Sequence, residues 1–184
     1  MAEQLEVERK FLVSLETKTI EVVSLPGTVI KKIDQFYLHR ITDGVERRAR
    51  RSMVLTPLVM SPKYQKGEKV LISRSAEMLN RDEKEQDITE DKYWDFMSIR
   101  DKSLMVIYKD RYVIPRNNLK YELDFFREPL LLILLEVEHL PQGVNPNPPD
   151  CIKIIREVTG DERYENYQIA AGKCPGYAEQ KTLT

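Results

Sequence analysis

The sequence predicts a mainly β protein of the α+β class, built as a closed antiparallel β-barrel of about eight strands with a few peripheral helices. Segments of strand character recur along the chain, and turns at Asp43-Gly44 and at 116–118 join neighbouring segments as hairpins. Charged residues follow a two-residue spacing in most of these segments, which puts them on one face of each strand. Antiparallel strands with hairpin links form either a sheet sandwich or a barrel. A closed barrel is favoured here, because alternate residues of its strands point inward and the charged faces would converge on one lumen.

Eight segments carry the strand signals. The first, LEVERKFLV (5–13), alternates charged and apolar residues, and the last contains the apolar run LLLILL (130–135). A strand that apolar is expected to be buried on at least one face and to accept apolar neighbours on both. In chain order, the expected strands are 5–13, 34–41, 45–52, 69–76, 80–88, 104–115, 119–126 and 130–140.

Helices are expected to be few and peripheral. One short helix is expected within 15–24, and a second runs from the capping residue Thr89 to about Ile99. A third is expected in DCIKIIREVTG (150–160), where three apolar residues form one stripe before a terminal glycine. The proline-containing segment 53–68 is expected to be a long connection.

Length and composition fit one domain spanning 1–184, with an expected flexible tail at about 173–184. The 29 basic and 30 acidic residues give a net charge of −1, so a general nucleic-acid or membrane binder is not expected. The start MAEQLEVERK lacks the pattern of a signal peptide, and a cytoplasmic location is therefore expected. A monomer and a homodimer are both compatible with the sequence.

Cysteine and histidine are too sparse for a zinc site. Cys151 and Cys174 have no CxxC partner, and His39 and His139 are the only histidines. The two cysteines are expected to be reduced thiols. Any bound metal would need oxygen ligands, which favours Mg²⁺, Mn²⁺ or Ca²⁺.

Glu136 and Glu138 share one face of the most apolar strand. Buried carboxylates require a cation, either a basic side chain or a metal, because an unpaired buried charge costs several kcal/mol. The alternative is that both glutamates lie at a solvated rim. Other charged residues also share strand faces, among them Arg48 with Arg50, Lys109 with Arg111, and Glu122 with Asp124.

A lumen with these two kinds of charge would suit a metal-complexed polyphosphate group. Carboxylate oxygens bind hard divalent cations, while arginine and lysine side chains bind phosphates. A divalent cation between Glu6 and Glu8 would also explain why two like charges stand side by side on the first strand.

Eight short motifs extend this pattern. Taken in order between residue 5 and about residue 171, they resemble the CYTH superfamily, the triphosphate tunnel metalloenzymes, and are closest to bacterial inorganic triphosphatases. The motifs are Glu6-x-Glu8-x-Lys10, QFYL (35–38), RRAR (47–50), RDEKE (81–85), YKDRY (108–112), YELDFF (121–126), LLEVEHL (134–140) and EVTGDERYENYQIA (157–170).

The resemblance implies a tunnel and a set of site residues. Mg²⁺ or Mn²⁺ would be held by Glu6, Glu8, Asp124, Glu136 and Glu138. Phosphates would be bound by Lys10, Arg48, Arg50, Arg74 and Arg111, with Lys63 or Lys69 as alternatives to Arg74. Arg81, Glu83, Glu85 and Glu122 would support the site, Glu83 and Glu85 either by binding a second metal or by orienting Arg48 and Arg50.

The resemblance also implies a proton-transfer pair, Tyr37 and Lys109, in which a nearby ammonium would lower the pKa of the phenol. The alternative for Tyr37 is an ordinary strand aromatic. The sequence departs from bacterial triphosphatases at Glu162, Glu165 and Tyr167, in a segment where those enzymes often carry lysines.

The implied activity is divalent-metal-dependent hydrolysis of a small triphosphate, most simply inorganic triphosphate. Two other enzyme activities use the same tunnel in this superfamily: class IV adenylate cyclase and thiamine-triphosphatase-like hydrolysis. A non-catalytic module that binds nucleotides or polyphosphate is an alternative of a different class, although phosphate capture alone would not require five carboxylates.

Overall fold

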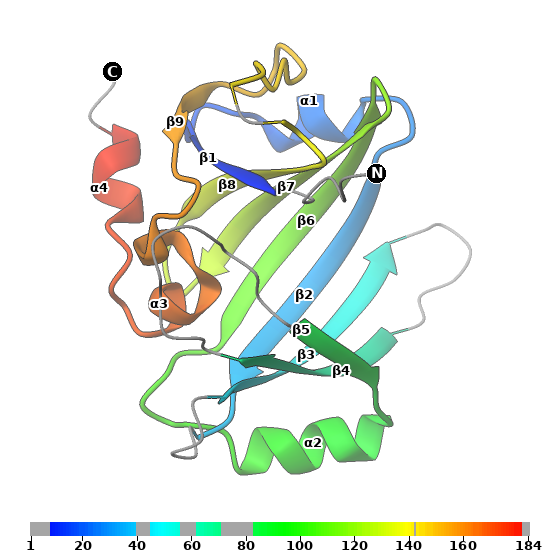
Figure 1. The fold of residues 1–184 in the computed structure, drawn as a ribbon. Helices are drawn as coiled ribbons and strands as arrows, with labels where there is room; N and C mark the ends of the chain where they lie inside the picture. Colours follow the sequence, from blue (N-terminus) through cyan, green and yellow to red (C-terminus); the bar gives the residue numbers. More distant parts are fainter. Residues whose placement is uncertain (1–7, 40–44, 56–61, 71–82, 142, 182–184) are drawn as a thin grey trace, which may run out of the picture.

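The computed structural model describes five segments of the chain: 8–39, 45–55, 62–70, 83–141 and 143–181. Their strands form one antiparallel sheet of nine strands in the order β5-β4-β3-β2-β6-β7-β8-β1-β9 (Figure 1). The strands are β1 (Arg9–Val13), β2 (Val29–Tyr37), β3 (Val45–Leu55), β4 (Pro62–Val70), β5 (Glu83–Asp87), β6 (Ile107–Arg116), β7 (Leu119–Glu128), β8 (Leu132–Glu138) and β9 (Ile154–Glu157).

The helices are short and lie around this sheet, as Figure 1 shows. Thr89 Oγ1 accepts a hydrogen bond from the Lys92 backbone N–H at 3.3 Å, which confirms the expected cap. No helix in the described segments is long and apolar enough to cross a lipid bilayer. The helices are α1 (Thr19–Val23), α2 (Glu90–Ser98), the 3₁₀ helix η1 (Glu162–Tyr164), α3 (Asn166–Ala170) and α4 (Gly176–Lys181).

The mainly β class and the antiparallel pairing are confirmed. The sheet has two edges, β5 and β9, and no hydrogen-bonded ladder joins them within the described part of the chain. The closed barrel expected from the sequence is therefore not confirmed by hydrogen bonding.

The structure differs from the sequence predictions at 53–68 and 69–76. The expected connection 53–68 contains the end of β3 and most of β4, which pair from Val45↔Val70 to Met53↔Pro62. Pro62 is tolerated because it begins its strand, where a missing N–H does least harm. The strand expected at 69–76 thus starts earlier, and 71–76 lie outside the described residues.

The helix expected at 150–160 is also wrong, because residues Ile154–Glu157 form strand β9 along β1. Tertiary contacts decide the conformation here, since Arg9 donates hydrogen bonds to both carboxylate oxygens of Glu157, at 2.9 and 2.7 Å. The β-branched pair Ile154-Ile155 also favours a strand.

Part of the segment for which a flexible tail was expected forms helix α4. Its Gln180 is 5% exposed and donates a hydrogen bond to the Ile133 carbonyl at 3.3 Å. Its Glu179 accepts hydrogen bonds from Arg156 and Tyr164. These contacts attach α4 to the body of the sheet.

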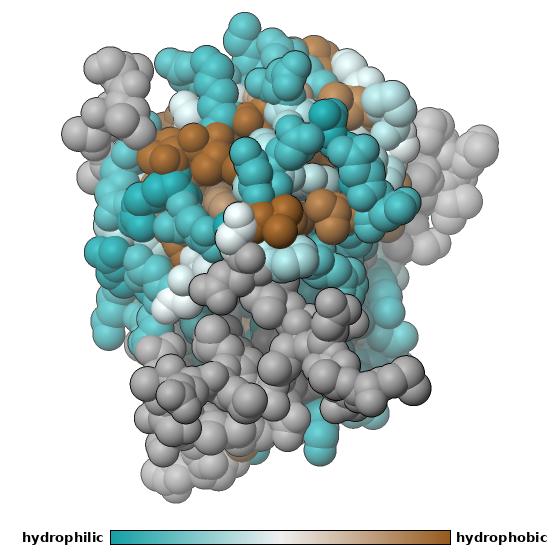
Figure 2. Space-filling view, turned by 45° about the horizontal axis from the view of Figure 1, so that its top comes forward, coloured by the Kyte–Doolittle hydropathy of each residue, from teal (hydrophilic) through white to brown (hydrophobic). Residues whose placement is uncertain are grey.

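Strand β8 is buried on both faces, as its composition predicts. Ile133, Leu135 and Val137 lie in one core cluster with residues of β1, β6 and β7, covered by α1 and by Leu140 and Ile152. Figure 2 shows the covering face, where apolar patches alternate with hydrophilic side chains.

The other face of β8 changes character along its length. Leu132 and Leu134 are each 1% exposed and pack in a second cluster with Ile169 and Ala170 of α3. The next residues on that face are Glu136 and Glu138, which line a cavity. The inner side of the curved sheet thus has two parts. Where α3 packs against it, the inner side forms an apolar core, and beyond α3 it lines a charged cavity.

Candidate active site

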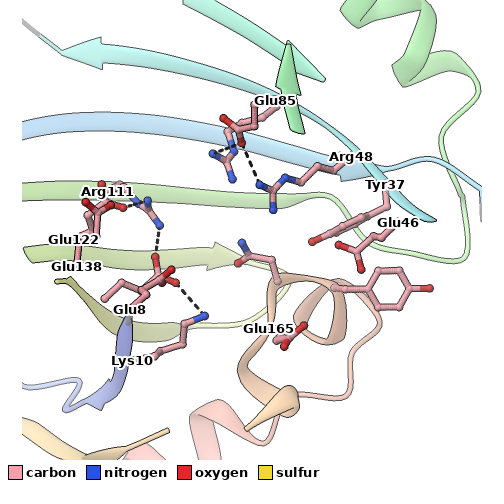
Figure 3. Close-up of a pocket in the computed structure, with 14 residues that line it drawn as sticks. Glu8, Lys10, Tyr37, Glu46, Arg48, Glu85, Arg111, Glu122, Glu138 and Glu165 are labelled. Atoms are coloured by element: carbon pink, nitrogen blue, oxygen red, sulfur yellow. Dashed lines mark hydrogen bonds and ion pairs between the residues drawn. The ribbon is translucent and has the colours of Figure 1, made fainter. Parts of the chain in front are cut away.

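A cavity of about 320 Å³ lies on the inner side of the sheet. Seven of the nine strands contribute to it, because residues at alternate positions of successive strands share this face (Figure 3). The residues that line it are Glu8, Lys10, Tyr37, Glu46, Arg48, Arg50, Glu85, Arg111, Glu122, Glu136, Glu138, Glu165, Asn166 and Tyr167.

One wall of the cavity is basic. Arg48 on β3 donates a hydrogen bond to Glu85 of β5 at 3.1 Å, and Arg50 approaches the same Glu85 oxygen at 3.5 Å. Arg50 also donates to Gln35 Oε1 from two nitrogens, at 3.2 and 3.0 Å. Glu85 thus contacts both guanidinium groups, which is the geometry that the orienting alternative requires.

The Arg50 guanidinium carries a charge that its surroundings do not fully offset. Burial lowers its pKa below the ordinary arginine value, and repulsion from Arg48 and Arg111 lowers it further. An anion bound at this wall would relieve that repulsion.

Gly67 allows Arg48 to reach Glu85. The glycine lies on β4 between these two residues, opposite Arg48 in one ladder and opposite Glu85 in the other. A Cβ atom at Gly67 would lie 3.0 Å from Arg48 Nε and 3.2 Å from its Cγ. The missing side chain therefore provides the space that the Arg48 side chain occupies.

The facing wall is acidic, and Arg111 lies at its centre. Its Nε and Nη2 donate to the two oxygens of Asp124, each at 2.6 Å, and Nη2 also donates to Glu136 at 2.7 Å. A further ion pair joins it to Glu122. Burial alone would lower the pKa of Arg111, but Asp124 and Glu136 raise it well above the ordinary value.

Glu136 is held ionised by two cations. Lys10 Nζ lies 3.0 Å from its Oε1, and Arg111 contacts its other oxygen. Burial would raise the pKa of Glu136, but Lys10 and Arg111 hold it well below its usual range. Glu138 pairs with Lys120 at 2.6 Å and retains 37% side-chain exposure.

The pKa of Glu8 shifts in the opposite direction to that of Glu136. The Glu8 side chain projects into the cavity, where protein atoms surround it on several sides and solvent in the cavity still reaches it. Burial and the negative charge of Glu136 raise the pKa of Glu8 to about 7, against the smaller opposing effects of Lys10 and Arg111. The acidic wall therefore contains more negative charge than its own cations offset.

The structure brings most predicted site residues together, with clear exceptions. Asp124 does not line the cavity, because it is 1% exposed and paired with Lys109 and Arg111. Lys63 pairs with Asp87 at 3.1 Å and does not line the cavity either. Three predicted residues, Glu6, Arg74 and Arg81, lie outside the described residues, and the side chains of Lys69 and Glu83 are likewise not described.

The contacts of Tyr37 and Lys109 differ from those of the predicted pair. Tyr37 Oη accepts a hydrogen bond from Gln35 Nε2 at 2.8 Å, whereas Lys109 Nζ lies 2.6 Å from Asp124 Oδ2. Burial and the charge of Glu46 raise the pKa of Tyr37, which is opposite to the expected lowering. Burial also lowers the pKa of Lys109 to about 8.

Four residues of the lining had no predicted ligand role: Glu46, Glu165, Asn166 and Tyr167. Glu46 follows the same two-residue spacing as Arg48 and Arg50, so the sequence contained a signal for its position on the inner face. Asn166 and Tyr167 belong to α3, and Glu165 lies between η1 and α3; the approach of this segment to the sheet depends on tertiary packing.

The acidic wall suits a hard divalent cation in its chemistry. Its carboxylate oxygens are the preferred ligands of Mg²⁺ and Mn²⁺. Burial and the neighbouring charge of Glu136 raise the pKa of Glu8, so a nearby cation would favour its ionised form. Among the described residues, no three potential ligands already converge on one point. Glu8, Glu136 and Glu138 fit such an ion, provided that their basic partners move aside.

A curved antiparallel sheet whose inner face sets an acidic wall against a basic wall is the arrangement expected of a triphosphate tunnel protein. The chain is structurally similar to "the inorganic triphosphatase NE1496", at 25% identity over 93% of this chain and 97% of that chain, with a TM-score of 0.59. A second structure, described as the hypothetical protein NE1496, matches at 26% identity over 90% and 97% of the two chains, with a TM-score of 0.57.

A protein from Pyrococcus horikoshii, PH1819, shares the fold at 20% identity and a TM-score of 0.51, over 74% of this chain and 78% of its own. No family model and no curated protein matches the chain. The structural matches confirm the relationship to CYTH triphosphatases that the motifs predict.

Proposed function

We propose that this protein is a divalent-metal-dependent triphosphatase that hydrolyses inorganic triphosphate in a tunnel formed by the curved sheet. The observation that carries the proposal is the opposite charge imbalance of the two walls. The pKa of Glu8 is raised on the acidic wall, and the pKa of Arg50 is lowered on the basic wall. A metal–triphosphate complex would supply a cation to the first wall and an anion to the second.

The charge of the described lining supports a requirement for metal. Seven glutamates and four basic residues line the cavity, so the lining has a net charge of −3 when all are ionised. A surface of that charge repels a polyphosphate unless cations accompany it. Mg²⁺ or Mn²⁺ would be held by Glu8, Glu136 and Glu138, and when bound would neutralise phosphate oxygens and favour ionisation of water.

The basic residues have two different roles in this proposal. Arg48 and Arg50 present guanidinium forks that suit phosphate oxygens, and Lys10 adds a point charge. Arg111 was also predicted to bind phosphate, but its donors are occupied by carboxylates. Its proposed role is therefore to keep Asp124 and Glu136 ionised and in position.

Tyr37 is proposed to act as a hydrogen-bond donor. Because its pKa is raised, its hydroxyl keeps its proton at neutral pH and is unsuited to act as a general base. Its hydroxyl accepts a hydrogen bond from Gln35 and lines the cavity, where it would donate to a phosphate oxygen. Lys109, held on Asp124, positions that carboxylate.

Inorganic triphosphate is favoured over a triphosphate with a ring system. Tyr37 and Tyr167 are the only aromatic residues of the described lining, and they pack edge to face at a centroid distance of 5.2 Å. Tyr37 is 1% exposed, so its face is covered rather than open to a base. The adenylate cyclase and thiamine-triphosphatase alternatives would need an apolar or aromatic surface for the organic group.

The test is incubation of the purified protein with triphosphate, ATP or thiamine triphosphate, each with Mg²⁺, Mn²⁺ or EDTA. Metal-dependent phosphate release from triphosphate is expected, with much slower reaction of the other two. Cyclic AMP from ATP would identify a cyclase instead. Binding of triphosphate without turnover of any of the three compounds would favour the non-catalytic module.

A further inference from the structure

Gln35 lies directly behind the lining of the cavity, and both ends of its amide are bonded to residues of that lining. It is 0% exposed and does not itself belong to the described lining. On strand β2 it lies opposite Arg50 in the ladder with β3, and it shares its face of the strand with Tyr37, two residues on. The intervening Phe36 packs on the other face, against Tyr93 of α2. The register of β2 and β3 therefore places this amide between two side chains of the candidate active site.

The chemistry of Arg50 determines which way the Gln35 amide points. A guanidinium group has donors and no acceptor, so the Gln35 atom that meets Arg50 has to be the amide oxygen. Arg50 Nε and Nη2 donate to this oxygen at 3.2 and 3.0 Å. The other end of the amide is the NH₂ group, which can only donate, and Gln35 Nε2 lies 2.8 Å from Tyr37 Oη. The Tyr37 oxygen must therefore be the acceptor in this hydrogen bond.

This arrangement turns the Tyr37 proton away from Gln35. In the part of the chain that the structure describes, the contact with Gln35 is the one hydrogen bond of the Tyr37 hydroxyl. Figure 3 shows that this hydroxyl is directed into the cavity, which Tyr37 lines. A phosphate oxygen in the cavity would thus meet a hydroxyl whose acceptor side is already occupied and whose proton remains to be donated.

The same amide determines which edge of Arg50 is presented to the cavity. Gln35 occupies the edge formed by Nε and Nη2, while Nη1 lies 3.5 Å from Glu85 Oε1. Each terminal nitrogen of a guanidinium carries two protons, so Nη1 and Nη2 can still donate together along their shared edge. That edge matches the spacing of two phosphate oxygens.

On the basis of the function proposed above, we propose that Gln35 is a positioning residue for triphosphate. It holds Arg50 by one edge and holds the Tyr37 oxygen as an acceptor, so that the other edge of Arg50 and the Tyr37 proton are both directed at the phosphate chain. Gln35 acts through these two side chains and does not touch the substrate.

Gln35→Glu tests the direction of the hydrogen bond to Tyr37. The carboxylate keeps the shape of the side chain and still accepts from Arg50, but it has no donor, so Tyr37 has to donate to it and its proton turns away from the cavity. Triphosphate hydrolysis with Mg²⁺ is measured for the parent, Gln35→Glu, Tyr37→Phe and the double variant. Gln86→Glu is the matched control, because it adds the same charge at an exposed residue of β5 that does not line the cavity.

Gln35→Glu should lower kcat/KM by at least about tenfold, as expected for the loss of a hydrogen bond to a charged group. This loss should shrink severalfold when Tyr37→Phe is already present, because the proton that the substitution redirects is then missing. Gln86→Glu should stay within about twofold of the parent, since an exposed charge is screened. An equal loss with and without the Tyr37 hydroxyl would overturn the proposal, because added charge alone would explain it. Parent-like kinetics of Gln35→Glu would overturn it as well.

Gln35→Met replaces Gln35→Glu if the buried carboxylate prevents folding, as judged by circular dichroism. Methionine removes both amide contacts without adding a charge, so the Tyr37 hydroxyl is no longer held in one orientation. Its loss in kcat/KM should be severalfold and should again shrink in the Tyr37→Phe background. An equal loss in both backgrounds would overturn the proposal.

Binding of triphosphate with Mg²⁺, read as a rise in the unfolding temperature, separates this inference from the proposed function. If the parent binds triphosphate without releasing phosphate, the triphosphatase is refuted, and the coupling between Gln35 and Tyr37 is read from the affinities instead. Phosphate release without any such coupling would support the hydrolase and refute the role of Gln35. A parent that neither binds nor hydrolyses triphosphate would refute both.

Discussion

Replacing Arg111 by methionine tests whether the acidic wall depends on its central guanidinium. Methionine keeps a similar length but removes the charge that contacts Glu122, Asp124 and Glu136. Breaking a buried ion pair by removing one partner usually costs about 3–5 kcal/mol, because the remaining charge is left uncompensated.

The lower end of that range is expected here. Each carboxylate keeps one other cation after the substitution: Lys120 for Glu122, Lys109 for Asp124 and Lys10 for Glu136. A loss of about 3 kcal/mol in a chain of this length corresponds to a fall of roughly 6–12 °C in the unfolding temperature. The measurement is thermal and denaturant unfolding at pH 7.5 without metal.

Arg127→Met is the matched control. Arg127 is the exposed member of an ion pair with Asp110, on the neighbouring strand, and its side chain is 54% exposed. Exposed pairs contribute about 0–1 kcal/mol, so this variant should unfold within about 2–4 °C of the parent. Equal, small effects of the two substitutions would refute the central role of Arg111.

The pH dependence gives the same experiment a second readout. The pKa values of Asp124 and Glu136 are depressed in the folded parent, so the stability that they contribute is present above about pH 4 and lost as pH falls further. Without Arg111 these folded pKa values rise, and protonation costs the folded state less. The stability difference between Arg111→Met and the parent should therefore stay constant from pH 7.5 to about pH 4 and shrink as pH falls further. A difference that stays constant below about pH 4 as well would show that lost packing, rather than lost charge, causes the effect.

Three further outcomes are expected. Glu8→Gln should be more stable than the parent at pH 8 but not at pH 4. The pKa of Glu8 is raised to about 7 in the folded parent, so the parent loses stability as pH rises from the unfolded-state pKa of Glu8 through its folded-state pKa. Urea unfolding at the two pH values measures this difference, and an equal effect at both would contradict the prediction. Gly67→Ala should keep the fold but displace Arg48, raising the KM for triphosphate severalfold; unchanged kinetics would show that Arg48 does not need this space. Triphosphate with Mg²⁺ at 100 times its Kd should stabilise the parent by about 2.7 kcal/mol, read from thermal unfolding, and neither component alone should match this.

The sequence predicted the elements in which local pattern and tertiary environment agree. In β8 the apolar residues at both faces indicated a strand buried on both sides, and Leu134 and Leu135 are indeed almost fully buried. In α2 the Thr89 cap and the acidic first turn specified the helix start. The spacing Arg48-x-Arg50 likewise placed both guanidinium groups on the inner face.

Prediction failed where a distant partner determined the conformation. The stripe in 150–160 is compatible with a helix, but the Arg9–Glu157 pair and the β1 ladder favour a strand there. The direction of the Tyr37 pKa shift was also wrong, because burial and Glu46 outweigh neighbouring cations. Neither effect can be calculated without knowing which residues lie around the group in space.

In the proposed function, the arrangement of the acidic wall would link metal binding to phosphate binding. Lys10 forms an ion pair with Glu136, and Lys120 forms one with Glu138. A divalent cation bound to these carboxylates would weaken their attraction for both lysines and leave the ammonium groups available to an anion. A phosphate bound to Lys10 would in turn free a carboxylate oxygen for the metal. Because such coupling is reciprocal in binding free energy, each ligand should raise the affinity of the site for the other, and a cavity with a net negative lining can still bind a polyanion.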